Sequence, residues 1–425
     1  MPNDFESILK LNFKDQTSKT LDYFWIGFTL YTVAFALSTS TTVNYTFCQF
    51  FQLIGIFLFV TSAIKLIKWK FNNDYIKVLF ILYCSWQLTI IARGFIFDYN
   101  NIKVMLFDAE AGIFRFFVPL ILLFPKNLLY YKKIIKVILI LGVVFLMFDI
   151  IFIHNLLNLD YENTDSKFTY EHFVKILSVT CGLILLTFPY QTKRNKYIAF
   201  AVIIVSILFS VIRARRALLI MTISPLVITY ILFLYSQKKN IFVAIVPFLF
   251  VLIILMFGDN TSKNTPRIFR LLSDRATEDT RTGVEIAFYH DMSPQDWIIG
   301  KGINGKYYCP GIDIASLTDY RSMIETDYLN IILKGGIISL ALLFLIAIPS
   351  FIKGLFFSKN MLTKAAAIWI LLWLIELYPA NVSNFSLHYL LFWMAIGICN
   401  SNVIPEIPED KIVEIFSNLN QTGTK

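Results

Sequence analysis

The arginines of this sequence gather in a few places, and arginine is the side chain best suited to holding an anion. Three of them, Arg213, Arg215 and Arg216, lie close together, and the polar stretch after residue 258 adds Arg267, Arg270, Arg275, Arg281 and Arg321. A planar guanidinium can hold a phosphate or a carboxylate through two parallel hydrogen bonds, which a lysine ammonium cannot. We therefore expect an anionic ligand, most simply a phosphate or a pyrophosphate. Some of these arginines could instead pair with acids of the same stretch, such as Asp274, Glu278 and Asp279.

Long apolar segments must position these arginines. The chain has 425 residues, of which 57% are hydrophobic and 16% are charged, and a soluble domain of this length would need far more polar surface. The recurring apolar runs predict an all-α, polytopic transmembrane helix bundle of about 12 spans. We place these spans at residues 22–39, 47–67, 75–92, 111–125, 134–153, 172–190, 197–212, 217–235, 241–257, 328–350, 361–378 and 386–402.

Lysine sets the predicted orientation of the bundle. Every second loop is rich in lysine, and the positive-inside rule makes the face that carries these loops cytoplasmic. Both termini then lie in the cytoplasm, and we expect a bacterial inner (plasma) membrane. The first 20 residues lack a cleavable signal pattern, so the first helix should be retained. Because the lysines act as topology signals, the net charge of +9 does not indicate a nucleic-acid partner. The lysines in question include Lys65, Lys68, Lys70, Lys126, Lys132, Lys133, Lys193, Lys196, Lys238, Lys239, Lys353, Lys359 and Lys364.

The predicted organisation is a single transmembrane domain over residues 1–402, followed by a cytoplasmic tail over residues 403–425. A large external loop, residues 258–327, separates spans nine and ten. Loops of this length in compact folds are usually functional or disordered. The glycines, aromatic residues and mixed charges of this loop favour an ordered structure.

The arginines do not follow the lysines. Only Arg194 falls on the predicted cytoplasmic face, and the arginines at 213–216 oppose the orientation rule, which leaves a topology error as the alternative. Ionisable residues inside the spans also lie toward the external ends, and such residues usually face a polar cavity because they are costly in lipid. We infer a water-filled cavity that opens to the outside. Lys175 and Lys334 could instead extend to the interface. The ionisable residues in the spans are Arg115, Asp149, Lys175, Lys334 and Glu376.

No cofactor or metal site is expected. The five cysteines show neither a metal-ligand spacing nor a disulfide framework. Asp108 and Glu110 form an acidic pair in an external loop that could bind a divalent cation, but no histidine or third acid accompanies them.

Motifs in the large loop carry a resemblance to a known family. The loop contains Arg281 before an amphipathic segment, a glycine turn at Gly300 and Gly302, and the sequence Glu325-Thr326-Asp327 before a helix that carries Gly335-Gly336. In this order, over residues 200–345, the sequence resembles the O-antigen ligase and polymerase superfamily. These are bacterial membrane glycosyltransferases that use polyprenyl-diphosphate-linked glycans. Ligases typically carry a His-Asn step where this chain has Glu325-Thr326-Asp327, and the difference favours the polymerase branch.

The resemblance implies a reaction and roles for particular residues. A sugar hydroxyl on one undecaprenyl-diphosphate-linked glycan, the acceptor, attacks the anomeric carbon of another, the donor, and the lipid diphosphate leaves. Arginines would stabilise the diphosphate, with Arg213, Arg215, Arg216 and Arg281 ranked first and Arg267, Arg270 and Arg321 behind them. A carboxylate or a histidine would take the hydroxyl proton, with Glu325 first and then Asp327 and His290. Asp327 or Thr326 could instead cap the following helix, and His290 could be a solvated loop residue. A chain-length regulator protein would be a further partner.

Three other functions compete with polymerisation. A ligase would transfer the glycan to a lipid A core sugar, and only the missing His-Asn step argues against it. A flippase or transporter of lipid-linked oligosaccharide would suit twelve spans, but transporter halves usually resemble each other, and the long loop here is off centre. A scaffold subunit would give the external arginines no purpose.

Overall fold

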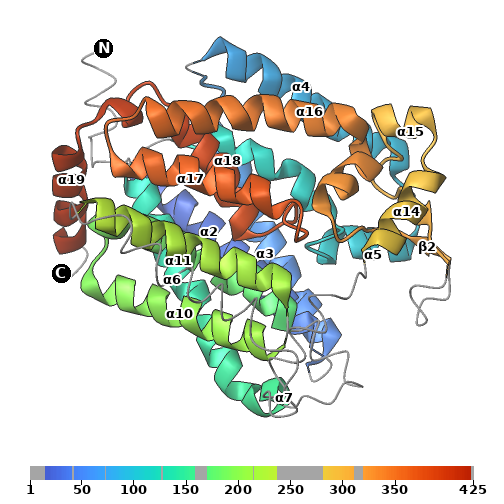
Figure 1. Ribbon diagram of the computed structural model, residues 1–425, viewed down its shortest axis with the longest axis horizontal. Coiled ribbons are helices and arrows are strands. Elements are labelled where there is room, and N and C mark those ends of the chain that lie inside the picture. Colours follow the sequence, from blue (N-terminus) through green and yellow to red (C-terminus); the bar gives the residue numbers. More distant parts are fainter. Residues whose placement is uncertain are drawn as a thin grey trace, which may run out of the picture.

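The fold is a bundle of helices with very little strand (Figure 1). We analysed a computed structural model of residues 1–425, and the structure describes residues 15–40, 43–71, 73–125, 128–157, 170–213, 215–236, 281–310 and 319–422. The first half of the chain forms α2 (Asp15–Ser38), α3 (Tyr45–Leu66), α4 (Asp74–Gly94), α5 (Tyr99–Phe107), η1 (Ile113–Leu123), α6 (Leu128–Ile151), α7 (Ile153–Leu157), η2 (Val174–Ser178), α9 (Cys181–Leu186), η3 (Phe188–Tyr190), α10 (Lys193–Ile212) and α11 (Arg216–Ser236). The second half forms α14 (Thr282–Asp291), α15 (Pro294–Ile299), β1 (Tyr307–Tyr308), β2 (Tyr320–Arg321), α16 (Asp327–Phe356), α17 (Met361–Glu376), α18 (Leu387–Cys399), η4 (Ile404–Glu406) and α19 (Glu409–Thr422).

The predicted all-α membrane bundle is confirmed at this level. Within the described ranges, seven helices are long and apolar enough to cross a bilayer, namely α2, α3, α4, α6, α10, α11 and α16. The shorter apolar helices η1 and α18 coincide with two further predicted spans. The ninth predicted span, residues 241–257, lies outside the described residues, as do residues 258–280 and 311–318 of the large loop. The number of spans and their orientation therefore stay predictions.

The sixth predicted span, residues 172–190, is not one continuous helix. It consists of the single π-helical turn η2, the short helix α9 and the 3₁₀ turn η3. The Ser178 and Thr187 hydroxyls donate to the carbonyls of Val174 and Leu183, and Pro189 lies within η3. Side-chain bonds of this kind bend helices, and proline cannot donate to the helical ladder. Isolated π turns are frequently found at functional sites, and Lys175 of this one lines the cavity described below.

Helix α16 is broken at Gly336, which has φ 68° and ψ −177°, a backbone conformation that essentially only glycine adopts. The break leaves the carbonyls before it without their usual helical donors. The Lys301 N–H donates to the Leu333 carbonyl (2.7 Å), and the Gly302 N–H donates to the Lys334 carbonyl (2.9 Å). The Trp86 indole donates to the Gly335 carbonyl (2.8 Å). The kink therefore docks the loop segment from α15 onto the transmembrane helix.

The predicted glycine turn forms at this docking point. Gly300 and Gly302 have φ values of 71° and 80°, which side chains other than glycine adopt at a cost. A Cβ atom at Gly300 would lie 2.5 Å from the backbone of Lys334 and Gly335. Glycine is therefore required here both for conformation and for close approach to α16.

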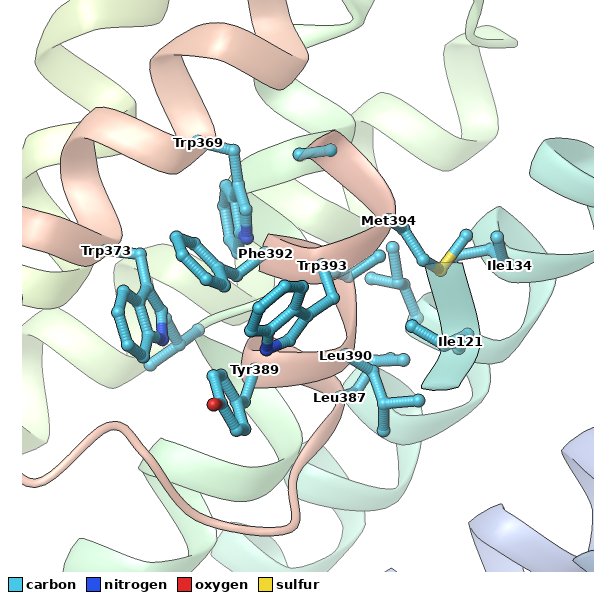
Figure 2. Packing of buried hydrophobic residues seen from close by; sticks show 14 of the residues in the cluster. Ile121, Ile134, Trp369, Trp373, Leu387, Tyr389, Leu390, Phe392, Trp393 and Met394 are labelled. Atoms are coloured by element: carbon cyan, nitrogen blue, oxygen red, sulfur yellow. The ribbon is translucent and has the colours of Figure 1, made fainter. Parts of the chain in front are cut away.

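The core of the bundle is rich in aromatic side chains (Figure 2). Trp373 of α17 stacks on Phe392 of α18 with ring centroids 4.0 Å apart, and on Tyr389 at 5.2 Å. On the other side of α18, Leu387, Leu390 and Met394 pack toward Ile121 and Ile134 of η1 and α6. Burial of this apolar surface fixes α17, α18 and η1 against one another, and the loops at the ends of these helices form part of the cavity wall.

Residues 404–422 are structured and pack against the bundle. The Glu409 carboxylate at the start of α19 accepts hydrogen bonds from the Tyr190 hydroxyl (2.8 Å) and the Met361 N–H (2.6 Å). The Asn360 side chain donates to the Ile404 carbonyl (2.7 Å) and to the Ile407 carbonyl (3.0 Å). Helix α19 lies at the opposite end of the bundle from α14 and α15 (Figure 1). The tail therefore covers the end of the bundle that the sequence predicts to be cytoplasmic.

Candidate functional site

A polar cavity of about 430 Å³ lies among the ends of several helices. Six parts of the chain form its wall: the loop before η1, the segment leading into η2, the start of α11, Arg281, residues 321–325, and the loop after α17. The lining residues are Glu110, Glu171, His172, Lys175, Arg215, Arg216, Ala217, Leu218, Arg281, Arg321, Met323, Ile324, Glu325, Pro379, Ala380 and Asn381. Residues far apart in the sequence thus share one site.

Five of the residues predicted from sequence meet in this cavity, namely Arg215, Arg216, Arg281, Arg321 and Glu325. Arg213 does not line it. It ends α10 and is buried among the helices, with 6% of its surface exposed. Arg267 and Arg270 lie outside the described residues. The anionic ligand predicted from the arginine pattern would therefore meet at least four guanidinium groups in one place.

Asp327 and His290 do not line the cavity. Asp327 is fully buried, and its carboxylate accepts hydrogen bonds from the Val382 N–H (2.9 Å), the Ser383 N–H (2.6 Å) and the Ser383 hydroxyl (2.8 Å). Its observed contacts are structural, because they tie the start of α16 to the loop before α18. Thr326, at the N-cap of α16, makes no side-chain cap bond and donates to the Glu285 carboxylate instead (2.6 Å). His290 lies exposed on α14.

Arg281 is held in place by three partners. Its guanidinium donates to the Tyr378 carbonyl (3.4 Å) and to the Pro379 carbonyl (2.8 Å). Its Nε atom lies 3.6 Å from the Glu325 carboxylate, which is more than half exposed. A guanidinium has five N–H donors, so Arg281 can keep these backbone contacts and still present donors to a ligand. The residue that the resemblance singled out thus lies in the cavity wall in a fixed position.

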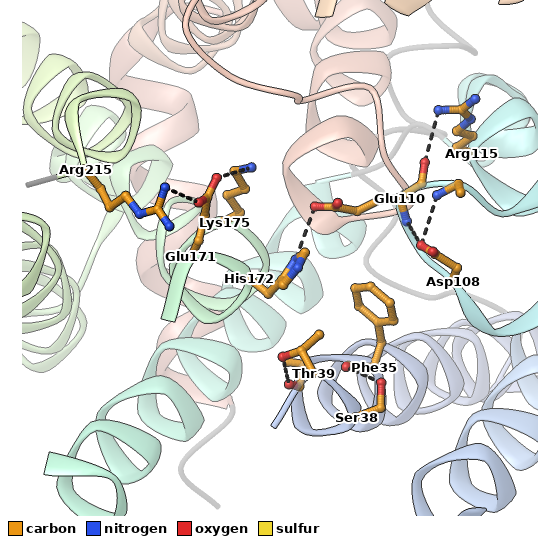
Figure 3. Close-up of polar contacts among 12 residues, drawn as sticks. Phe35, Ser38, Thr39, Asp108, Glu110, Arg115, Glu171, His172, Lys175 and Arg215 are labelled. Carbon is orange, nitrogen blue, oxygen red and sulfur yellow. Dashed lines mark hydrogen bonds and ion pairs between the residues drawn. The ribbon is translucent and has the colours of Figure 1, made fainter. Parts of the chain in front are cut away.

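A network of charged groups forms another part of the cavity wall (Figure 3). The Glu171 carboxylate lies 2.7 Å from the Lys175 ammonium and 3.3 Å from the Arg215 guanidinium. The Glu110 carboxylate lies 3.2 Å from Nδ1 of His172. Each of these side chains is largely buried. This wall therefore carries two acid–base pairs side by side.

The backbone around Glu110 is fixed by two further side chains. Arg115 donates to the Glu110 carbonyl (3.0 Å), and the Asp108 carboxylate accepts the N–H groups of Glu110 (2.7 Å) and Ala111 (3.0 Å). The Asp108 carboxylate thus stabilises a turn, and it does not join Glu110 in a shared cation site. Among the described residues, no group of three or more histidines, cysteines or acids could hold a metal ion.

Both carboxylates of this wall remain ionised. Burial raises the pKa of Glu110, but the positive charges of His172, Lys175 and Arg115 outweigh it and lower that pKa to about 2. Burial likewise raises the pKa of Glu171, while Lys175 and Arg215 outweigh it, so the net shift is downward. The carboxylates therefore act as fixed negative charges that hold the cations of the wall in place.

The ionisable residues of the predicted spans do not all line one cavity, as the sequence had suggested they would. Lys175 lines the cavity and Arg115 lies behind it, but Lys334 donates to the Gly305 carbonyl (2.8 Å) in the docked loop. Glu376 pairs with His388 at 2.8 Å inside the bundle. Lys175 does not extend to the interface, because it is buried against Glu171.

Sequence reasoning missed His172, Glu171 and Glu110 as residues of the site. A signal was present, because Glu171, His172 and Lys175 are closely spaced at the start of an apolar segment. On a helix, that spacing places Lys175 within reach of both Glu171, four positions earlier, and His172, three positions earlier. The contact with Glu110, 62 positions earlier, could not be read from spacing.

The cavity carries an excess of positive charge. Lys175 and the four arginines contribute five cations, against the three carboxylates of Glu110, Glu171 and Glu325. Such a lining suits an anionic ligand that also carries hydroxyl groups, because arginines and carboxylates both bind polar groups in this setting.

No protein-family model, no curated protein and no solved structure matches this chain. The fold and the site themselves define the class: an α-helical membrane protein with an arginine-rich polar cavity near the ends of its helices.

Proposed function

We propose that this protein is a membrane glycosyltransferase that polymerises lipid-diphosphate-linked oligosaccharide repeat units into a surface polysaccharide. The observation that carries the proposal is the meeting of Arg215, Arg216, Arg281 and Arg321 in one cavity beside ionised carboxylates and a histidine. These groups match the two needs of glycosyl transfer from a lipid diphosphate, which are stabilisation of the leaving group and removal of a hydroxyl proton.

The size and position of the cavity support this assignment. A volume of about 430 Å³ lies within the range of small-molecule sites and is suited to a diphosphate with an attached sugar. The cavity lies where α11 begins and α17 ends, so a diphosphate at headgroup depth could enter while its lipid chain stays in the bilayer. Fixed arginines would neutralise the diphosphate without a metal ion, since they are already in place when the charge develops.

Polymerase is favoured over ligase by the sequence at the mouth of the cavity. Glu325 lines the cavity where a ligase of the resembling superfamily would carry its His-Asn step. The dense packing of α19 and η4 against the other end of the bundle favours an enzyme with a one-sided site over a flippase, which needs a polar path on both sides.

Glycan length in cells that lack the protein tests the proposal. Surface glycan resolved on a gel should show single repeat units on the acceptor, and complementation should restore long chains. Arg215→Gln should fail to complement, whereas Lys359→Gln, an exposed cation far from the cavity, should complement fully. Long chains that accumulate on lipid diphosphate without transfer would make the protein a ligase. Unchanged glycan in the deletion strain would refute the proposal.

A further inference from the structure

His172 is the histidine of the cavity wall, and its surroundings are those of a base held ready for proton transfer. Its side chain is 18% exposed and lies among the arginines of the site. On one side its ring packs edge-on against Phe35, with centroids 5.9 Å apart. On the other side Nδ1 lies 3.2 Å from the Glu110 carboxylate. Contacts from α2 and from the loop before η1 thus fix the orientation of the ring.

Glu110 is itself rigidly placed. Arg115 holds its carbonyl, and Asp108 holds its N–H. Because the pKa of Glu110 is lowered to about 2, it stays a carboxylate and can stabilise a positive charge on the imidazole. A carboxylate beside Nδ1 also favours the tautomer with its proton on that nitrogen, which leaves Nε2 free to accept a proton. The same arrangement of carboxylate and imidazole activates nucleophiles in unrelated enzymes.

The other acids of the site are poorer bases. Glu171 is paired with both Lys175 and Arg215, and its pKa is lowered. Glu325 is more than half exposed and lies beside Arg281. Asp327 accepts three hydrogen bonds from the loop before α18 and does not reach the cavity. A general base must take up a proton in the transition state. A neutral imidazole can do so through Nε2, whereas carboxylates held by cations or by several hydrogen bonds are weak bases.

We infer that His172 is the general base of the transfer reaction and that Glu110 is its positioning residue. The inference rests on the proposed function. In the step, the acceptor hydroxyl oxygen forms a bond to the anomeric carbon of the donor sugar. The bond from that carbon to the diphosphate oxygen breaks, and the diphosphate leaves with the electron pair. The hydroxyl proton passes to His172, whose new positive charge faces Glu110 and the departing diphosphate.

The charges around His172 make this proton transfer depend on the ligand. Burial and Lys175 oppose the protonated imidazole, whereas Glu110 and Glu171 favour it. A bound diphosphate adds negative charge to the same cavity and partly offsets the cations. The base therefore holds its proton most easily while the leaving group is still present, which is when the reaction requires it.

His172→Ala tests the inference directly. Membrane vesicles from cells that lack the protein contain its native lipid-linked substrate, so purified variants can be added and the glycan resolved on a gel. We expect transfer to fall by about 10²–10⁴-fold, the usual contribution of a general base, while binding of undecaprenyl diphosphate stays within about twofold, as when the base alone is lost. Added imidazole should restore part of the activity, because it can occupy the space left by the ring. His154→Ala, an exposed histidine of α7, is the matched control and should behave as wild type.

Glu110→Gln and His172→Gln separate catalysis from packing. Gln at 172 keeps a polar side chain near Glu110 but cannot act as a base, so the variant should still fold and remain inactive. Gln at 110 removes the charge that favours the protonated ring, so the acidic limb of the pH–rate profile should move to lower pH. Two results would overturn the inference while leaving the proposed function intact. One is an active His172→Gln. The other is a His172→Ala whose transfer stays within about threefold of wild type, a change too small for loss of a general base. Failure of wild type itself to extend glycan would instead refute the proposed function.

Discussion

Replacing Glu110 with glutamine should destabilise the protein by an amount that the structure lets us calculate. The positive groups around Glu110 lower its pKa from 4.5 to about 2 against the opposing effect of burial. A difference of this size corresponds to about 3 kcal/mol of stability from the ionised carboxylate. Glutamine has nearly the same shape but no charge, so it forfeits this stabilisation and leaves His172 without its partner.

The sign of the pH dependence follows from the direction of the shift. Because the pKa of Glu110 is lowered on folding, its stabilisation is complete above about pH 4.5 and is lost as the pH falls through about 2. The difference between wild type and Glu110→Gln should therefore persist from pH 6 to pH 5 and narrow below about pH 4.

Thermal unfolding of the purified protein in detergent measures the effect. Unfolding entropy near 2 cal/mol/K per residue over 425 residues means that about 3 kcal/mol lowers Tm by about 3 °C. The matched control is Glu406→Gln, which removes an acid from the exposed pair with Lys359 and should change Tm by less than about 1 °C. Equal changes in Tm for the two variants at pH 6 would refute the electrostatic reasoning about the cavity wall.

Three further substitutions test other parts of the structure. Gly336→Ala should lower the free energy of unfolding by more than about 2 kcal/mol, because alanine cannot easily adopt φ 68° and its Cβ would collide with the Ile298 carbonyl. The control is Gly283→Ala, on the exposed face of α14. It should raise the free energy of unfolding by up to about 1 kcal/mol in the same assay. Asp327→Asn should lower Tm because three hydrogen bonds to the carboxylate weaken or are lost. Transfer per folded molecule should stay within about threefold, and a loss above about 100-fold would make Asp327 catalytic. Arg281→Lys should reduce glycan transfer by more than about tenfold because the fork to Tyr378 and Pro379 is lost, whereas Lys263→Ala, outside the described residues, should leave it unchanged.

The helical framework could be predicted because the signals that specify it are local. The predicted spans 47–67 and 197–212 contain enough hydrophobic side chains to cross a bilayer, and the structure forms helices α3 and α10 there. Gly300 and Gly302 likewise indicated a turn, because glycine can adopt the positive φ values that such a turn requires. The break at Gly336 was not predicted, since it depends on donors from Lys301, Gly302 and Trp86 that lie far away in sequence.

The candidate site was predictable in part. The clustered arginines indicated an anionic ligand, and four of these arginines line one cavity. Arg213 was misplaced because arginines that are adjacent in sequence point in different directions where α10 ends and α11 begins. Glu325 and Asp327, two residues apart, also separate, one into the cavity and one into the bundle. Spacing alone could not decide which side chain would face which way.

Carboxylates in a cavity built for an anion have a physical purpose under the proposed function. Several arginines and a lysine would repel one another if left unpaired, and ordering them at the moment of reaction would cost free energy. Glu171 is buried and lies close to two cations, so it is difficult to displace and acts as a permanent part of the wall. Glu325 is more than half exposed and 3.6 Å from Arg281, so a diphosphate can displace it at little cost. We therefore expect the diphosphate to bind on the Arg281 side, which leaves the acceptor hydroxyl to approach from the wall that carries His172.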